Sequence, residues 1–119
     1  MTLTRMTLRL YFGDLAFGPG KADLLENVAG EGSISAAARK MGMSYKRAWS
    51  LVEEMNAAFA EPLVDSTRGG AHGGGAHLTP AGEAVLADYR ALTARLLRDG
   101  ATEIDAIAAR LRPDISGGK

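Results

Sequence analysis

The chain has 119 residues, no cysteine and a formal net charge of zero, with 14 basic and 14 acidic side chains. This length allows one domain with a modest core, and the lack of cysteine excludes disulfides and thiolate metal sites. No apolar run approaches the ~20 residues that a membrane helix requires, and the alternating first segment does not resemble a secretory signal. We therefore expect a cytoplasmic protein without a membrane partner.

The first part of the chain predicts a strand followed by a helix. Residues 6–12 mostly alternate between polar and apolar side chains, as a half-buried strand does. Glycines and a proline within residues 13–20 then interrupt the chain. A first helix is expected over residues 21–29, and Gly30 and Gly32 end it. Its buried face should hold Ala22, Leu25 and either Val28 or Ala29.

The next segment predicts two helices joined by a glycine turn. Ser33 and Ser44 are placed to cap helices over residues 34–41 and 45–59, because a serine oxygen accepts hydrogen bonds from first-turn N–H groups. Gly42 stands between them, where a helix ends in a left-handed conformation that glycine adopts without strain. Alanines at 36–38 allow the helices to approach closely. This pattern is typical of a helix-turn-helix, whose second helix enters the DNA major groove.

The second of these helices has an inner stripe and an outward face that changes sign. Lys46, Arg47 and Ser50 face outward near its start, whereas Glu53 and Glu54 follow further along. The helix dipole also favours phosphate at that end, so the basic start should point toward DNA. At about 100° per residue, one narrow apolar stripe is expected in the core. It comprises Ala48, Leu51, Val52, Met55 and Phe59.

The zero net charge conceals an uneven distribution. Residues 1–50 carry seven basic and four acidic side chains, giving +3, while residues 51–119 carry seven and ten, giving −3. Residues 34–50 include four basic side chains and no acid. A local basic face matters more for phosphate contact than total charge does. Such a run is otherwise an ordinary solvated face, and here the serine caps and the glycine turn favour DNA.

Two aromatic residues and two serines lie beside this surface. Tyr45 is at the groove-facing end but next to the core stripe, so DNA contact and partial burial both remain open. Trp49 is expected in the core. Ser33 and Ser35 are candidate donors to the phosphate backbone, although capping alone explains Ser33.

Residues 63–68 and 76–79 predict two short strands around a glycine-rich connection at 69–75. Directly after a helix-turn-helix, this arrangement describes the wing of a winged helix. Glycine permits a close approach of backbone to phosphate, so Arg68, Gly69 and Gly70 are expected to touch phosphate or the minor groove. A nucleotide-binding loop is disfavoured because no GxxxxGK[ST] pattern is present.

The last segment predicts a long helix over residues 80–112. Thr79 is its cap, with a proline at the first helical position, and Gly100 should kink or split it. Pro113 ends it, and residues 113–119 are expected to be a disordered tail. An apolar seam on so long a helix needs a partner, so we expect a dimer interface. The seam consists of Val85, Tyr89, Leu92 and Leu96.

Several of these segments together resemble the N-terminal DNA-binding domain of ModE-type molybdenum-responsive regulators, one of the LysR-type winged helices. They are Gly-Ser-Ile-Ser-Ala-Ala-Ala at 32–38, Ser-Tyr-Lys-Arg-Ala-Trp at 44–49, Glu-Met-Asn at 54–56, the glycine-rich connection, and Leu-Thr-Pro-Ala-Gly-Glu at 78–83. The resemblance covers residues 6–97 and implies DNA binding and dimerisation. It does not extend to the molybdate-binding region of that family, so we expect that this chain alone does not bind molybdate with the affinity of a dedicated sensor.

A histidine in the wing departs from the family pattern. His72 stands where the family tends to carry lysine, so its contribution to DNA contact should depend on pH, because a free histidine titrates at about 6.5. With His77 it flanks the glycine run, but two histidines without a third ligand make a poor metal site.

The predicted fold is mainly α with a small β wing, in which a winged helix-turn-helix over residues 1–79 precedes the long dimerisation helix. The expected function is sequence-specific binding of double-stranded DNA by a homodimeric transcriptional regulator. One alternative is a single-domain sensor that binds an oxyanion or a metal ion, and another is a module that holds a second protein. No Ser/His/Asp set, carboxylate pair in an apolar frame or HExxH motif occurs, so we expect neither an enzyme nor a cofactor.

Overall fold

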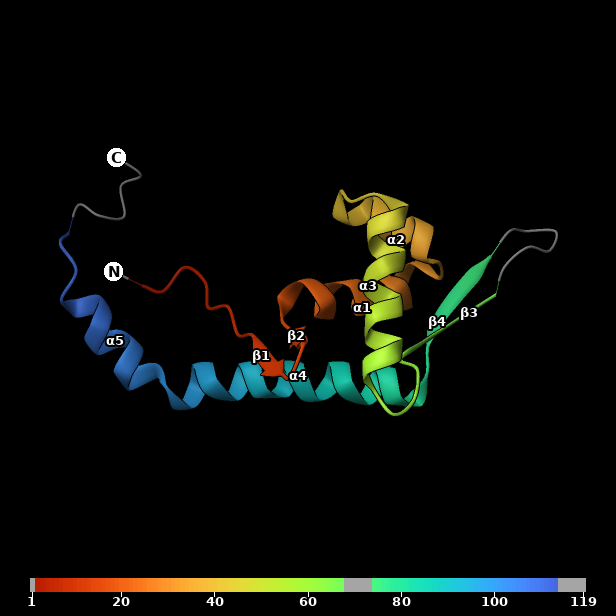
Figure 1. Cartoon of the computed structure of the whole chain (residues 1–119). Helices are drawn as coiled ribbons and strands as arrows, with labels where there is room; N and C mark the ends of the chain where they lie inside the picture. Colours follow the sequence, from red (N-terminus) through yellow and green to blue (C-terminus); the bar gives the residue numbers. More distant parts are fainter. Residues whose placement is uncertain (1, 68–73, 114–119) are drawn as a thin grey trace.

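The computed structural model describes residues 2–67 and 74–113. In this part of the chain, α4 forms a long base, and α1, α2 and α3 are stacked over its N-terminal half (Figure 1). The β3–β4 hairpin projects beyond them as the wing, and α5 lies at the other end of α4. The elements are β1 (Leu10–Phe12), β2 (Leu15–Phe17), α1 (Pro19–Glu31), α2 (Ile34–Met41), α3 (Tyr45–Ala58), β3 (Val64–Thr67), β4 (Gly75–Leu78), α4 (Pro80–Asp99) and α5 (Ala101–Ala109).

The N-terminal strand is shorter than predicted and has a partner that sequence reasoning missed. β1 pairs antiparallel with β2 in the register Leu10 to Phe17. Gly13 has φ 59°, which suits the first central position of a tight two-residue turn. This hairpin turns Phe17 into the core, where its ring meets Tyr89 edge-on at 5.2 Å between centroids.

The first helix is longer than predicted at both ends. It begins at Pro19 and passes through Gly30, and it ends where Gly32 adopts the left-handed conformation with φ 80°. Of the two alternatives for its inner face, Val28 is buried and Ala29 is exposed. Leu24, which the prediction omitted, is also fully buried.

The predicted caps of the helix-turn-helix are confirmed. Ser33 Oγ accepts a hydrogen bond from Ala36 N at 3.0 Å, and Ser44 Oγ accepts one from Arg47 N at 3.0 Å. Gly42 ends α2 with φ 69°. Helix α3 ends at Ala58, one residue earlier than expected.

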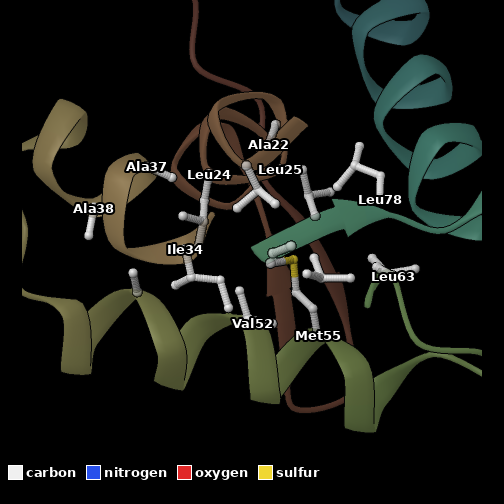
Figure 2. Close-up of a cluster of buried hydrophobic side chains, with 14 of the residues drawn as sticks. Ala22, Leu24, Leu25, Ile34, Ala37, Ala38, Val52, Met55, Leu63 and Leu78 are labelled. Carbon is white, nitrogen blue, oxygen red and sulfur yellow. The ribbon is translucent and has the colours of Figure 1, made fainter. Parts of the chain in front are cut away.

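The core lies where α1, α2 and α3 meet the base of the wing (Figure 2). Ala48, Val52 and Met55 of the predicted α3 stripe are buried, while Leu51 and Phe59 are partly buried against them. Full burial of a leucine or methionine stabilises the fold by roughly 1.5–3 kcal/mol. The largest fully buried side chains are Leu24, Leu25, Val28, Met55 and Leu63.

Asn56 joins the wing to α3. Its Oδ1 accepts hydrogen bonds from Leu63 N at 2.8 Å and Val64 N at 3.1 Å, and its Nδ2 donates to Val64 O at 3.0 Å. Strand β3 then pairs with β4 in the register Val64 to Leu78. The recognition helix and the base of the wing are therefore held together by side-chain to backbone bonds.

The long C-terminal helix is split at Gly100, as expected. Thr79 caps α4 by accepting from Gly82 N at 3.0 Å, and Pro80 opens the helix. Helix α5 ends at Ala109, earlier than the predicted stop at Pro113. None of the helices in the described part of the chain is long and apolar enough to span a membrane.

Half of the predicted dimer seam belongs to the core of its own domain. Tyr89 is 5% exposed, and its Oη donates to Leu8 O at 2.6 Å, while Val85 packs against the core. The spacing of these residues shows that they pack against an apolar partner, but it does not show whether that partner is the same domain or a second chain. Leu92 is half-buried and Leu96 is exposed, so the outer part of the seam stays accessible.

An ion-pair cluster fixes α4 against α1. Arg90 Nη2 lies 2.8 Å from Asp23 Oδ1 and 2.7 Å from Glu26 Oε1. The hydrogen bond to Asp23 raises the pKa of Arg90, against the lowering effect of burial, and Glu26 adds to the rise. The N-terminal half of α4 is therefore seated on the helix-turn-helix by both apolar and ionic contacts.

Candidate nucleic-acid interface

The start of α3 presents exposed polar and basic side chains. Ser44, Tyr45, Lys46, Arg47 and Ser50 are all exposed. Neither Lys46 nor Arg47 forms an ion pair with a residue that the structure describes. Both charges stand in the first turn of the helix, where the cap and the dipole already favour an anion. This end of α3 is therefore suited to a phosphate or a base edge.

The serines at the start of α2 are placed beside this surface, and each has a local partner. Ser33 is the cap, and the exposed Ser35 Oγ accepts from Arg39 Nη1 at 3.0 Å. Lys40 pairs with Glu31 at 3.3 Å between Nζ and Oε2. The basic side chains of α2 thus have polar or acidic partners within the fold, whereas Lys46 and Arg47 have no ion-pair partner among the described residues.

A cleft of about 430 Å³ lies between the start of α2, one side of α3 and the wing. Hydroxyl groups form much of its wall, two aromatic side chains come from α3, and none of the described residues that line it is acidic. The lining residues are Ser33, Ile34, Ser35, Tyr45, Trp49, Ser66, Thr67, Gly74, Gly75 and Ala76.

The prediction that Trp49 lies in the core is wrong. Its side chain is 37% exposed and lines the cleft. Helices α2 and α3 pack through small residues, among them the buried Ala37, Ala38 and Ala48, which leaves no space for an indole between them. Trp49 is therefore turned toward the wing, and its step of 100° from Ala48 was the signal for this.

Tyr45 is exposed, so of its two alternatives partial burial against the core is excluded, and contact with DNA stays a prediction. Its side chain is 54% exposed and lines the same cleft. Sequence reasoning did not identify Ser66 and Thr67, because their position depends on how the wing is set against α3. Asn56 supplies that setting through its bonds to Leu63 and Val64.

The predicted contacts at the tip of the wing lie outside the described residues. Arg68, Gly69, Gly70 and His72 remain predictions, as does the tail at 114–119. His77 is described, and its Nε2 lies 3.8 Å from Asp65 Oδ2 across the hairpin, with both side chains exposed. Within residues 2–67 and 74–113, no group of three or more His, Cys, Asp or Glu side chains is placed to hold a metal ion.

Curated relatives match the chain over most of its length. It is 51% identical to the molybdenum-pterin-binding protein MopB of Rhodobacter capsulatus over 65% of this chain and 28% of that protein. It is 38% identical to the molybdenum transport protein ModE of Azotobacter vinelandii over 99% of this chain and 43% of that protein. The DNA-binding transcriptional dual regulator ModE of Escherichia coli K12 is 42% identical over 60% of this chain and 27% of its own length. The chain thus spans less than half of these relatives.

Solved structures and a family model agree with the winged helix. The chain resembles the CbnR DNA-binding domain in a crystal structure with DNA, with a TM-score of 0.56, 26% identity, and coverage of 76% of this chain and 97% of that one. Full-length CbnR with its target DNA shows the same fold, with a TM-score of 0.53, 24% identity, and coverage of 71% of this chain and 27% of that one. The model for bacterial regulatory helix-turn-helix proteins of the lysR family matches residues 21–83. These residues run from α1 through the helix-turn-helix and wing to the start of α4, so the chain belongs to the lysR family of bacterial regulatory helix-turn-helix proteins.

Proposed function

We propose that this chain is the DNA-binding part of a bacterial transcriptional regulator and that it acts as a homodimer on a specific duplex site. The observation that carries this proposal is the exposed pair Lys46 and Arg47 in the capped first turn of α3, without an ion-pair partner among the described residues. In a helix-turn-helix, the start of the second helix reaches base edges in the major groove.

The surfaces beside α3 supply the remaining contacts. The start of α2, with Ser33 and Ser35, and the wing border the same cleft beside α3, and their hydroxyl groups would meet phosphates of the duplex. The likeness to a DNA-binding domain crystallised with DNA supports this arrangement. A regulator of this kind acts on the chromosome, so we place it in the bacterial cytoplasm and assign it no catalytic step.

The dimer is proposed to form along the outer part of α4. Leu92 is half-buried, and Leu96 and Leu97 are 41% and 39% exposed at the end of α4 away from the helix-turn-helix. A two-fold contact there would present two α3 helices to half-sites about 34 Å apart, or a multiple of this distance. One domain alone offers few base contacts, and two are needed to select a site in a genome.

The proposal is tested by selecting a binding site from a random duplex library and measuring affinity at several salt concentrations. We expect Lys46→Ala or Arg47→Ala to lose roughly 1–3 kcal/mol on the selected site where the residue contacts a base edge. A contact to phosphate alone would weaken all duplexes equally and reduce the salt slope. Arg9→Ala is the control, since Arg9 is an exposed arginine beside Gly18 at the start of α1, outside both the cleft and the proposed dimer contact.

The result that contradicts the proposal is affinity unchanged in both α3 variants at moderate salt. The single-domain sensor is the alternative, and the comparisons favour the regulator over it. Calorimetry with molybdate separates the two, because a sensor would bind with a defined stoichiometry and a DNA-binding part alone would not.

A further inference from the structure

Two large aromatic side chains are exposed on the recognition helix. Tyr45 is 54% exposed and Trp49 is 37% exposed. They are four residues apart and so lie on the same side of α3. Among the described residues of α1, α2 and α3, they are the large hydrophobic side chains on the surface, since the other exposed ones lie in the N-terminal segment, β1, α4, α5 and the residues after it.

The fold does not account for these two positions. Neither ring stacks on another aromatic ring of the described chain, and neither the hydroxyl of Tyr45 nor the indole N–H of Trp49 has a hydrogen-bond partner there. By contrast, the buried Tyr89 has both an aromatic neighbour and a bonded hydroxyl. Tyrosine and tryptophan that keep exposed apolar area on a soluble domain are typical of contact surfaces.

The chemistry of the surrounding cleft indicates which partner they meet. Hydroxyl groups of Ser33 and Ser35 at the start of α2, and of Ser66 and Thr67 on the wing, line the same cleft as the two rings. Among the residues that the structure describes, no carboxylate lines the cleft, and Lys46 lies on the neighbouring face of α3. Hydroxyl groups and a nearby cation suit the phosphates of one DNA strand, so that strand would run through the cleft with its base edges facing α3.

We propose that Tyr45 and Trp49 form an aromatic strip that reads thymine, with Trp49 as a specificity-determining residue that packs on the 5-methyl group. That methyl group is the apolar feature of the major groove, and it projects on the side of the base near its own strand's backbone. The aromatic strip therefore faces the groove edge where a methyl group distinguishes thymine from cytosine. The inference rests on the proposed function, because it requires α3 to lie in the major groove.

The test removes the methyl group from the DNA and the indole from the protein. Each thymine of the selected site is replaced in turn by deoxyuridine, which lacks the 5-methyl group and keeps the base pair. We expect the unmodified protein to lose affinity about fourfold at one or two positions, the factor for burying one methyl-sized group. In Trp49→Ala the same replacements should have no effect, since the group that covers the methyl is gone.

Two further variants make this comparison specific. Tyr11→Ala removes an aromatic side chain that is 70% exposed on β1, away from the cleft, and should keep the full sensitivity to deoxyuridine. Tyr45→Ala removes the other half of the aromatic strip and should lose sensitivity at a neighbouring thymine. Both side chains of the strip are exposed, so circular dichroism should show unchanged folding. Tyr45→Ala provides the test if Trp49→Ala does not fold.

Trp49 also reports directly on the contact. It is the single tryptophan of the chain, so tryptophan emission comes from this position alone. Binding of the selected duplex should shield the indole from acrylamide quenching, and Lys46→Ala at the same DNA concentration should show less shielding.

The outcomes separate failure of this inference from failure of the proposed function. If no duplex is enriched from the random library, the DNA-binding function itself fails. If a site is enriched but deoxyuridine has no effect at any thymine, the aromatic strip does not read the methyl group. Equal losses in the unmodified protein and in Trp49→Ala also overturn the inference, because the methyl would then act through another residue, or Trp49 would lie against deoxyribose.

Discussion

Asn56 shows how much of the interface depends on one side chain that does not face the cleft. Its amide makes three hydrogen bonds to the backbone of residues 63 and 64, at 2.8, 3.1 and 3.0 Å. These bonds satisfy the backbone just where the chain leaves the helical layer and enters β3. Ser66 and Thr67 reach the cleft because this connection fixes the start of the strand.

We expect Asn56→Ala to lower the free energy of unfolding by roughly 2–4 kcal/mol, because it leaves partly buried N–H and C=O groups without partners. Urea unfolding followed by circular dichroism measures the change. Asn27→Ala is the matched control, since Asn27 makes one exposed bond to Asp23 O at 2.9 Å and its loss should cost less than about 1 kcal/mol. Equal losses in the two variants would show that the amide network adds nothing beyond a surface bond.

Helix α4 begins with a close approach that only glycine allows. A Cβ built on Gly82 would overlap the carbonyl oxygen of Leu63, which is backbone and cannot rotate away. Gly30 lies within α1, where an added Cβ would meet open space. A side chain is therefore excluded at Gly82 by a close backbone contact, and there is room for one at Gly30.

We expect Gly82→Ala to destabilise the domain by roughly 1–3 kcal/mol or more, because α4 must move off the base of the wing. Gly30→Ala should instead stabilise it by roughly 0.5–1 kcal/mol through reduced freedom of the unfolded chain. Thermal and urea unfolding of the pair give the sign of each change. A Gly82→Ala protein as stable as Gly30→Ala would mean that the start of α4 is not held against Leu63.

The elements that sequence reasoning found are those whose signals are local. The bounds of α2 and the start of α3 follow from Ser33, Gly42 and Ser44, each of which acts on residues within a few positions. β2 was missed because three residues carry too little periodicity to predict a strand. Tyr89 was misplaced because its partners, Leu8 and Phe17, are distant in sequence.

The candidate site divides in the same way. The basic start of α3 could be predicted because a cap and a charge run are adjacent in sequence. The exposure of Trp49 was missed although its 100° step from Ala48 was a signal for it. How much of the indole is covered depends on how the elements around it pack, which the local pattern does not give. The hydroxyl groups of β3 could not be predicted as part of the site. They line the cleft because of where the wing lies, and that depends on a tertiary contact from Asn56.

At the scale of the molecule, exposed large aliphatic side chains gather away from the helix-turn-helix in the described part of the chain. The described part of the chain is elongated, with extents of 57 × 32 × 24 Å. The exposed side chains at the end of the molecule that carries α5 are Leu3 near the N-terminus, Leu96 and Leu97 on α4, and Ile107 and Leu111 at and beyond α5. This distribution agrees with a division into a DNA-facing end and an end offered to a second copy.

We expect Leu96→Asp to dissociate the dimer while the domain stays folded, because the change would bury an unpaired charge in the two-fold contact. Leu96 is 41% exposed in the single chain, so the fold itself should tolerate the change. Ala91→Asp is the control, since Ala91 is exposed and lies around the helix axis from both Leu96 and Leu97. Sedimentation velocity gives the mass, and circular dichroism the folding.

A Leu96→Asp protein that sediments as a dimer would place the two-fold contact elsewhere, and α5 with the N-terminal residues would be examined next. A monomeric wild-type chain at all concentrations would reject the dimer directly. Dissociation of both variants alike would show that any added charge on this half of α4 separates the copies.

The junction at Gly100 sets the direction of α4 relative to α5. Gly100 takes part in the backbone bonds of both helices, donating from its N to Leu96 O at 2.8 Å and accepting at its O from Ile104 N at 2.9 Å. The 20 residues of α4 extend roughly 30 Å from this point to the end that carries the recognition helix. If the second copy is held at this end of the molecule, each degree of change at Gly100 displaces α3 by about 0.5 Å over that length. The spacing of DNA half-sites that the protein accepts would then be determined at a residue far from any nucleotide.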